Sequence, residues 1–357
     1  MMVESNPELV PPRQHRSERF LATLAPFARV VLVSHVNPDP DALASMLGLQ
    51  ALLELRDPDK PVILTVDGMI ARAENQAMVD LIPIPLVPIE QVPLGPDVAV
   101  VMVDSQPRTG RRASEAATPV AVLDHHETGG DLDGVLFRDI RANLGATSTM
   151  VTGYLLEQDV SVSPRLATAL LYGIDSEVSG YPRESGPLDD GALAWLYPRA
   201  DKDLLARIKN PKLSQDYFAT FQNALANAFL YRDVVVSWCG VVPQPDIIAE
   251  LADFFIRFDR VNWALSVGLF DGTLKLSMRA ANLGGHSGEV LRVVVEGSGS
   301  AGGHDKRAGG AIPLPDTRPE TIDQALRTIR HRLLTRLDIN EQHGHRLLEA
   351  SPIIQAP

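Results

Sequence analysis

Acidic and imidazole side chains follow apolar stretches of this 357-residue sequence at the point where each stretch ends. His35, Asp39 and Asp41 come directly after the β-branched run VVLVS. Buried strands seldom end in three groups that are costly to remove from water. We therefore expect these side chains to face partners that other parts of the chain supply.

Three further clusters occupy comparable positions. They are Asp104 after AVVMV, Asp124-His125-His126 after VAVL, and Asp175 with Glu177 in LLYGIDSEVSG. A single aspartate in such a position is usually a turn former or a helix N-cap. In open α/β sheets, however, the carboxyl ends of the strands line the ligand crevice, so one fold can gather all four clusters.

The chemistry of these clusters favours metal binding. Carboxylate and imidazole ligands without a thiolate suit Mn²⁺ or Mg²⁺ better than structural zinc. About four carboxylates and two histidines are too many ligands for one ion, and they suit two ions that share a carboxylate. Such dinuclear centres cleave phosphate esters.

The elements that position the clusters alternate between strand and helix. The predicted strands are 28–35, 61–66, 97–104 and 118–126, and the predicted helices are 39–56, 71–82, 145–158, 163–174 and 188–198. This alternation predicts a parallel sheet covered on both faces. The segment 83–96 contains five prolines and is predicted to be an extended connection around the sheet.

The pattern changes at residue 233. Strands are predicted at 233–242, 261–270, 272–280 and 308–315, and helices at 245–258, 285–298 and 319–338. The sequence thus predicts an α/β fold with an N-terminal parallel-sheet domain and a smaller C-terminal α+β domain, joined by a helical linker. The expected bounds are 15–199 and 233–340 for the domains, 200–232 for the linker and 341–357 for a polar tail.

Composition restricts the class of protein. No apolar run reaches the roughly 20 residues of a membrane-spanning helix, and the first residues lack the apolar core of a secretory signal. Cys239 is the single cysteine, which excludes an internal disulfide. We predict a cytoplasmic protein with no membrane partner.

Charge and aromatic content argue against long nucleic acid as a partner. A net charge of -12 is unlike that of proteins that coat a long duplex. Aromatic residues make up 5% of the chain, and those in DYFATFQ and DFFIRF are predicted to be core, not a platform for base stacking. A small phosphorylated substrate remains compatible with this composition.

Several segments resemble a known family. SHVNPDPDALAS, VMVDSQP and LDHHET resemble the first three motifs of the DHH phosphoesterases, and SAGGHDKRAGG resembles the glycine-rich signature of their associated C-terminal domain. RANLGATSTMVTGYL resembles the segment after the third motif in the branch that hydrolyses very short RNA (nanoRNase) and 3',5'-bisphosphorylated adenosine. The likeness spans residues 25–315.

The resemblance implies two Mn²⁺ ions, with Mg²⁺ as the alternative. One ion would be held by His35, Asp39 and Asp104. The other would be held by Asp41, Asp104, His125 and an acid of the fourth motif. Asp104 would therefore bridge the two ions.

The resemblance also implies two catalytic roles and leaves one ligand open. Asp124 would orient the histidines, and His126 would face the scissile phosphate. In the fourth motif the family reads Gly-Ile-x-Thr-Asp-Thr, whereas this chain reads GIDSEV. By register Glu177 replaces the ligand aspartate, and Asp175 is the alternative.

In the second domain, the resemblance implies a site for the substrate end away from the metals. Its residues would be Arg279, Gly302, Gly303, His304, Arg307 and Gly309. Glycines there allow a close approach of the backbone to an anion. His286, in a second GGH triplet, is predicted to lie at a helix start.

The implied function is hydrolysis of a phosphoester bond in short oligoribonucleotides or small nucleotides. A cyclic dinucleotide phosphodiesterase would share every motif. The departure at Glu177 also leaves open a nucleotide-binding protein with weak or no hydrolysis. A family II pyrophosphatase shares the first domain, but the glycine-rich motif argues against it. Homodimers are common among such relatives, and the resemblance allows one here.

Overall fold

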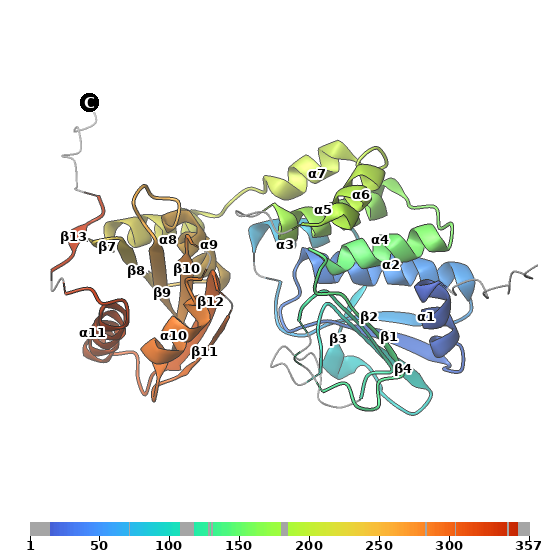
Figure 1. Ribbon diagram of the computed structural model, residues 1–357, viewed down its shortest axis with the longest axis horizontal. Coiled ribbons are helices and arrows are strands. Elements are labelled where there is room, and N and C mark those ends of the chain that lie inside the picture. The colour runs from blue at the N-terminus through green and yellow to red at the C-terminus, as the bar shows by residue number, and fades with distance from the viewer. Residues whose placement is uncertain are drawn as a thin grey trace, which may run out of the picture. The chain divides into compact units, whose positions relative to one another are not determined.

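The computed structural model describes residues 15–348 except 71, 108–117, 128, 130, 180–184, 283, 304 and 341–342. The chain divides into two compact units, Met1–Pro211 and Lys212–Pro357, and each has one sheet (Figure 1). The division falls inside the stretch 200–232. Helix α7 (Lys202–Lys209) belongs to the first unit and α8 (Gln215–Ala226) to the second.

The sheet of the first unit has six strands, all parallel, in the order β3-β2-β1-β4-β5-β6. The strands are β1 (Arg29–Val33), β2 (Val62–Val66), β3 (Leu86–Pro88), β4 (Val98–Val103), β5 (Ala121–Asp124) and β6 (Phe137–Ile140). The predicted α/β fold is confirmed. Two edge strands were not predicted, and β3 lies within the proline-rich segment because an edge position tolerates proline.

Helices cover one face of this sheet (Figure 1). The helices are α1 (Arg16–Leu24), α2 (Pro40–Arg56), α3 (Ala73–Leu81), α4 (Thr147–Glu157), α5 (Pro164–Val178), α6 (Pro187–Leu196) and α7. Buried side chains of β1 and α2, such as Leu32 and Met46, join one core. In the described part of the chain, the segments around Val92 and Val135 pack against the opposite face.

Helix α5 approaches α2 and α4 closely at Gly173. A methyl group at this position would lie 2.7 Å from Ser148 Oγ and 3.0 Å from Ala44 Cβ. Only glycine allows this approach without displacing a neighbour. The contact matters for function because α2, α4 and α5 each carry residues of the site described below.

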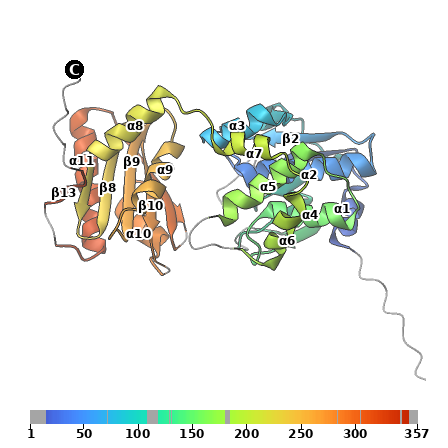
Figure 2. The same ribbon diagram turned by 90° about the horizontal axis from the view of Figure 1, so that it is seen from above.

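The second unit has a seven-stranded sheet in the order β11-β12-β10-β9-β8-β7-β13. Its elements are α8, β7 (Ala228–Tyr231), β8 (Val234–Val241), α9 (Asp246–Phe255), β9 (Trp263–Phe270), β10 (Thr273–Ala280), α10 (Ser287–Val295), β11 (Ser300–Gly303), β12 (Arg307–Pro313), α11 (Pro319–Arg336) and β13 (His345–Arg346). Helices α8 and α9 pack on one face and α10 and α11 on the other (Figure 2). The predicted α+β class is confirmed.

Three short strands of this sheet were not predicted from the sequence. Residues 228–231 were predicted to be helical but form β7, whose partners are β8 and β13. The described residues of the predicted polar tail supply β13. Strand β11 pairs with β12, so the glycine-rich signature forms an antiparallel hairpin.

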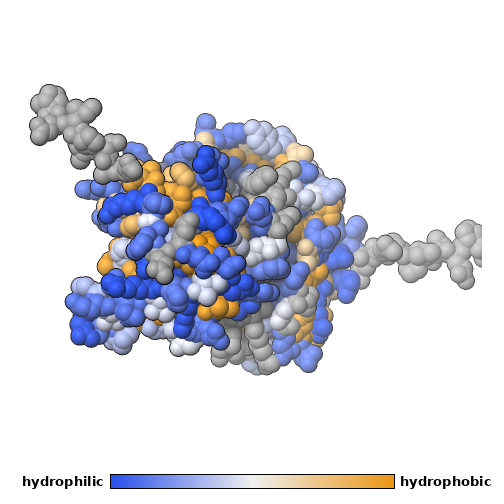
Figure 3. Space-filling model, turned by 60° about the vertical axis from the view of Figure 1, so that its left-hand side comes forward, coloured by the Kyte–Doolittle hydropathy of each residue, from blue (hydrophilic) through white to orange (hydrophobic). Residues whose placement is uncertain are grey.

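The prediction that the aromatic residues of α8 and α9 are core is wrong in part. Phe221 packs against the core and Phe255 is buried, but Phe218 is 62% exposed and Phe254 44% exposed. Both helices lie in an outer layer, so only one side of each is covered. On the face shown in Figure 3, apolar residues form separated groups among hydrophilic ones. No helix in the described ranges has the length and apolar character needed to cross a membrane.

Candidate metal centre

The first three clusters meet where the sheet order reverses direction. Strands β1 and β4 are neighbours, and the sheet grows from β1 to β2 on one side and from β4 to β5 on the other. In open α/β sheets the crevice outside the strand ends at such a reversal is the ligand site. His35 follows β1, Asp104 follows β4, and Asp124 ends β5.

His35, Asp39 and Asp104 form the first tight group, with one potential ligand atom of each within 4.8 Å of the others. His35 Nε2 lies 3.5 Å from Asp39 Oδ2 and 3.5 Å from Asp104 Oδ2. The other ring nitrogen, Nδ1, lies 3.0 Å from the carbonyl oxygen of Val36. Because a carbonyl only accepts, Nδ1 carries a hydrogen, and Nε2 faces two carboxylates across a space where a proton or a metal ion would lie.

This geometry fits a cation between the three side chains. His35 Nε2 is buried and, among the described residues, has no hydrogen-bond partner. A lone pair facing carboxylate oxygens is repelled unless a proton or a metal ion lies between them. A carbonyl on Nδ1 is also the usual second contact of a metal-bound imidazole. These donors fit a divalent ion such as Mn²⁺ or Mg²⁺.

His35 and the nearby carboxylates shift one another's pKa values. Burial lowers the pKa of His35, but Asp39 and Asp104 outweigh it, so the pKa lies well above its usual value. Burial raises the pKa of Asp39, but His35 outweighs it and the pKa is lowered. Without a metal, the site therefore holds a proton where a cation would bind.

Local backbone geometry positions two of these carboxylates. Asp39 is the N-cap of α2, and its Oδ1 accepts a hydrogen bond of 3.0 Å from Ala42 N, which leaves Oδ2 toward His35. Asp104 has a left-handed backbone with φ of 54°, and its N–H donates to Leu123 O at 2.8 Å. Aspartate tolerates this conformation better than most residues. This turn places the Asp104 carboxylate between the rings of His35 and His125.

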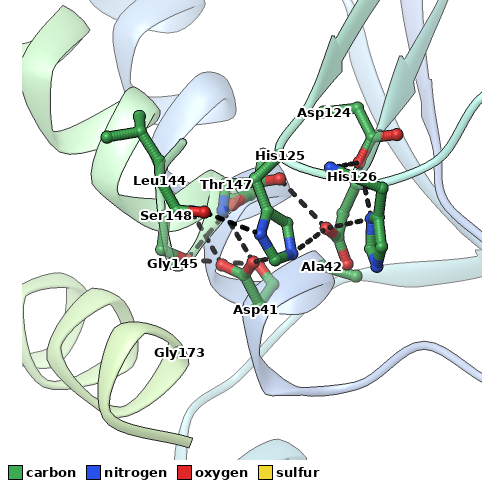
Figure 4. A network of polar contacts seen from close by, with 12 residues as sticks. Asp41, Ala42, Asp124, His125, His126, Leu144, Gly145, Thr147, Ser148 and Gly173 are labelled. Atoms are coloured by element: carbon green, nitrogen blue, oxygen red, sulfur yellow. Dashed lines mark hydrogen bonds and ion pairs between the residues drawn. The ribbon is translucent and has the colours of Figure 1, made fainter. Parts of the chain in front are cut away.

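Asp104, His125 and His126 form the second tight group. His125 Nε2 lies 3.5 Å from Asp104 Oδ1 and 3.8 Å from Asp41 Oδ2. Its Nδ1 lies 3.3 Å from Leu144 O, so this ring repeats the arrangement of His35 (Figure 4). Burial lowers the pKa of His125, but Asp104 and Asp41 outweigh it and raise the pKa to about 9.

Asp41 lies beside this group and is fully buried. Its Oδ2 accepts from Thr147 N and its Oδ1 from Ser148 N, both at 2.7 Å, at the N-terminus of α4 (Figure 4). Burial and the charge of Asp104 raise the pKa of Asp41 well above its usual value. Each carboxylate oxygen has a second lone pair, so these bonds leave Asp41 able to act as a ligand.

His126 is held by Asp124. Its Nδ1 lies 2.8 Å from Asp124 Oδ1, and its backbone N–H donates to the same oxygen at 3.2 Å. Burial raises the pKa of Asp124, but the hydrogen bond from His126 outweighs it, so the pKa is lowered. Asp124 is therefore an ionised acceptor that sets the position of one ring of the His125-His126 pair.

The two acids of the fourth motif face different surroundings. Asp175 forms an ion pair with Lys209 of α7 and accepts a hydrogen bond of 2.7 Å from Ser179 Oγ. It lines a pocket of about 450 Å³ between α5, α6 and α7. The charge of Glu177 instead raises the pKa of both Asp41 and His125. Positions two apart on a helix point about 200° apart, which explains the difference.

Sequence reasoning missed two buried polar residues that support the centre. Gln106 Nε2 donates to Asp124 Oδ2 at 2.7 Å. Asp189 of α6 accepts from Gly145 N at 3.0 Å and from Thr149 Oγ1 at 2.6 Å, so it holds the residues on either side of the α4 N-terminus. Neither residue has a sequence signal beyond its place near a motif, because an isolated Gln or Asp is usually exposed.

The predicted substrate residues of the second unit lie together at one end of its sheet. Arg279 pairs across the sheet with Arg307, and Gly302 with Gly309. A side chain at Gly302 would meet no atom within 4 Å, so the backbone there is open to approach. His304 lies outside the described residues.

Arg279 is buried and already engaged. Its Nε donates to Asp253 Oδ1 at 2.5 Å and its Nη1 to Ser277 Oγ at 2.8 Å. Asp253 thus fixes the direction of the guanidinium beside the hairpin. His286 is the N-cap of α10, as predicted for a helix start, and its Nδ1 lies 3.0 Å from Asp305 Oδ1.

Comparisons with known proteins place part of the first unit in a family. Residues 29–174 match the DHH family, N-terminal domain. An uncharacterized protein of Methanocaldococcus jannaschii is 29% identical over 321 residues, which cover 88% of this chain and 65% of that protein. A cyclic-di-AMP phosphodiesterase of Geobacillus thermodenitrificans is 25% identical over 328 residues, 85% of this chain and 47% of that protein. The chain thus spans less than two thirds of either relative.

Solved structures show the same fold. An exopolyphosphatase-related protein from Bacteroides fragilis superposes with a TM-score of 0.70 at 17% identity, covering 89% of this chain and 97% of that one. RecJ from Thermus thermophilus, solved in complex with Mn²⁺, gives a TM-score of 0.50 at 13% identity and covers 95% of this chain and 61% of that one. At these identities the likeness concerns the fold alone.

Proposed function

Because residues 29–174 are a DHH-family N-terminal domain, we propose that this protein is a metal-dependent phosphoesterase of short oligoribonucleotides or small nucleotides. The observation that carries the proposal is the pair of imidazoles, His35 and His125. Each donates Nδ1–H to a backbone carbonyl and aims Nε2 at Asp104 and a second aspartate. Such an arrangement would suit a dinuclear ligand set with one shared carboxylate.

The proposed ligands follow from these groups. His35, Asp39 and Asp104 would hold one ion. Asp41, Asp104, His125 and Glu177 would hold the other. Glu177 is preferred to Asp175 because its charge acts on Asp41 and His125, whereas Asp175 is paired with Lys209. We propose Mn²⁺, with Mg²⁺ as the alternative, because most of the donors are carboxylate oxygens, which suit both ions. The Mn²⁺ complex of RecJ supports this choice.

When bound, two divalent ions would supply an activated water and neutralise charge on the phosphate oxygens. The chain's own residues then orient the reaction. Asp124 accepts the Nδ1–H of His126, so Nε2 is the nitrogen that exchanges protons, and His126 in its protonated form donates a hydrogen bond to a phosphate oxygen. Thr147 Oγ1 donates to Asp104 Oδ1 at 3.0 Å and keeps the carboxylate that the two ions would share in place.

Substrate selection is proposed for the second unit. The hairpin residues Gly302, Gly303, Arg307 and Gly309, with Arg279 beside them, offer backbone N–H groups and positive charge to a terminal phosphate. The net charge of -12 opposes binding of a long duplex and favours a short substrate whose charge the metals neutralise. We also propose that the protein is cytoplasmic and that it can form a homodimer.

A cyclic dinucleotide phosphodiesterase is the second candidate, because a relative with that activity aligns over 85% of this chain. A panel assay separates the candidates. It compares dinucleotides, longer RNA, bisphosphorylated adenosine, cyclic di-AMP and pyrophosphate in the presence of Mn²⁺. We expect the highest kcat/KM on dinucleotides or bisphosphorylated adenosine, and preference for cyclic di-AMP would select the second candidate.

The metal centre itself is tested by Asp41→Asn and His125→Ala. Both variants are expected to lose Mn²⁺-dependent hydrolysis while they retain the circular dichroism spectrum of the parent. Calorimetric titration with Mn²⁺ should give two ions per chain. Hydrolysis that persists in both variants would show that the proposed centre is wrong, and one ion or none would favour a nucleotide-binding protein without turnover.

A further inference from the structure

A buried amide lies behind the proposed metal centre and has no role in the mechanism above. Gln106 is 1% exposed and follows Asp104 by two residues. Its Nε2 donates to Asp124 Oδ2 at 2.7 Å and to Glu127 O at 3.1 Å, and its Oε1 accepts from Gly129 N at 3.1 Å. These partners come from the loop that contains the two adjacent histidines.

The partners determine which way the amide points. Gly129 N–H can only donate, so the atom that it meets must be the oxygen of Gln106. Glu127 O can only accept, so the opposite end must be the NH₂ group. The same NH₂ group meets Asp124 Oδ2. A reversed amide would place oxygen against oxygen at Asp124 and N–H against N–H at Gly129, which burial makes costly.

The orientation of the Gln106 amide affects His126 through Asp124, which contacts both residues. Since Gln106 occupies Asp124 Oδ2 as a donor, the carboxylate presents Oδ1 to His126. That oxygen receives both the backbone N–H and Nδ1 of His126, at 3.2 and 2.8 Å. An ionised carboxylate only accepts, so Nδ1 carries hydrogen as long as Asp124 keeps this orientation, and Nε2 then has the lone pair of the neutral ring.

We propose that Gln106 is a positioning residue that acts through Asp124 to hold His126 in the tautomer with hydrogen on Nδ1. The tautomer is a property of the protein without substrate. Its effect on turnover rests on the proposed phosphoesterase function, because only then does His126 Nε2 exchange a proton with the substrate. The alternative is that Gln106 merely braces the loop through Glu127 and Gly129.

Histidine side-chain NMR tests the tautomer without reference to activity. We propose ¹³C and ¹⁵N spectra of the metal-free and Mg²⁺-loaded protein at a pH where His126 is neutral, with the signal assigned by its loss in His126→Gln. The parent protein should show Nδ1–H. A parent His126 that carries hydrogen on Nε2 overturns the proposal, and this arm requires no other variant to fold.

The variant Gln106→Met keeps the length of the side chain and removes both hydrogen-bonding atoms. We expect the Nε2–H tautomer of His126 to become populated, and Gln106→Asn should shift it in the same direction. Gln76→Met is the matched control, because Gln76 Nε2 also donates to an aspartate, Asp80 Oδ1 at 2.9 Å, but is exposed on α3. An unchanged tautomer in folded Gln106→Met assigns Gln106 to bracing the loop and overturns the proposal.

Kinetics on the best substrate of the panel provide the second readout. Supports behind metal-site residues typically contribute about 10- to 100-fold. We expect kcat of Gln106→Met to fall by that factor while KM stays within about twofold, because Gln106 does not contact substrate. Loss through KM alone would contradict a role on His126. If the parent hydrolyses nothing in the panel, the proposed function fails but the NMR test still decides the tautomer.

Discussion

The two groups of side chains that share Asp104 are built in different ways. His35 and Asp39 of the first group come from one short loop between β1 and α2, and only Asp104 comes from elsewhere. The second proposed metal site would combine His125, which follows β5, with Asp41 of α2, which the α4 N-terminus supports, and with Glu177 of α5 as the proposed acid. The first group therefore depends mainly on local geometry and the second on helix packing.

Loss of the shared residue should have the largest effect, because both groups depend on it. Asp104→Asn keeps the size of the side chain but removes its charge from both sites. We expect hydrolysis to fall by roughly 10³-fold or more, as expected when several kcal/mol of metal-ion stabilisation is lost. Calorimetry should show that neither ion binds tightly. Retention of two tight sites would disprove the shared carboxylate.

The next largest effect is expected from the fourth motif, whose acid belongs to only one of the two proposed metal sites. Glu177→Gln should lower activity by about 10- to 100-fold and weaken one of two Mn²⁺ sites, because only the second proposed metal site would lose a carboxylate. Asp175→Asn is the matched control and should change activity less than about twofold, since Asp175 faces Lys209. The reverse order of the two effects would make Asp175 the ligand.

Helix packing can be disturbed without removing any ligand. Gly173→Ala places a methyl group 2.7 Å from Ser148 Oγ and should destabilise the protein by about 1–3 kcal/mol. Gly153→Ala, on α4 with no atom within 4 Å of the added methyl, should instead stabilise by up to about 1 kcal/mol. Urea denaturation measures both. Weaker binding at one Mn²⁺ site in Gly173→Ala alone would show that the second group depends on this packing.

The smallest expected effect is a pH dependence of the metal's contribution to stability. The pKa values of His35 and His125 are raised in the folded protein, that of His125 to about 9. Stability from these protonated rings is complete below their unfolded pKa of about 6.5 and is lost as pH rises toward the folded values. A divalent ion replaces these protons, so it binds more tightly as pH rises.

Scanning fluorimetry with and without Mn²⁺ at pH 6 and pH 8.5 measures this effect. The metal-induced rise in Tm should be several degrees larger at pH 8.5 than at pH 6, since a change of about 1 kcal/mol moves Tm by a few degrees. An equal rise at both values would mean that no proton is displaced from the histidines. His35→Gln should reduce the difference by removing one of the two rings.

The strand ends were the part of the site that the sequence could predict. A β-branched run followed by acidic residues marks the end of a parallel strand, and such ends converge whatever the remaining sequence. The fourth-motif ligand was harder to predict, because the sequence offers two acids, Asp175 and Glu177, on opposite sides of one helix. The N-terminal half of α5 indicates a helix, but not which of Asp175 and Glu177 faces α2, because that depends on the rotation at which Gly173 packs.

Other features carried no local signal. Strand β7 follows helix α8 after a single residue, and its pairing with β8 and β13 is what makes it a strand. Gln106 and Asp189 look like surface residues in the sequence, yet both are buried with hydrogen-bond partners from distant segments. Partners so far apart along the chain are set by topology, which a short sequence window does not contain.

The sequence by itself determined the alternation of elements, the two units and the residue types available to a dinuclear centre, because periodicity and strand-end chemistry are local properties. The tertiary structure decided how those residues are used. It buried Asp41 against the α4 N-terminus, paired Asp175 with Lys209, brought the charge of Glu177 to act on Asp41 and His125, and placed Gln106 behind Asp124. Each decision depends on burial and on the rotation of a packed helix, which arise only when the layers assemble.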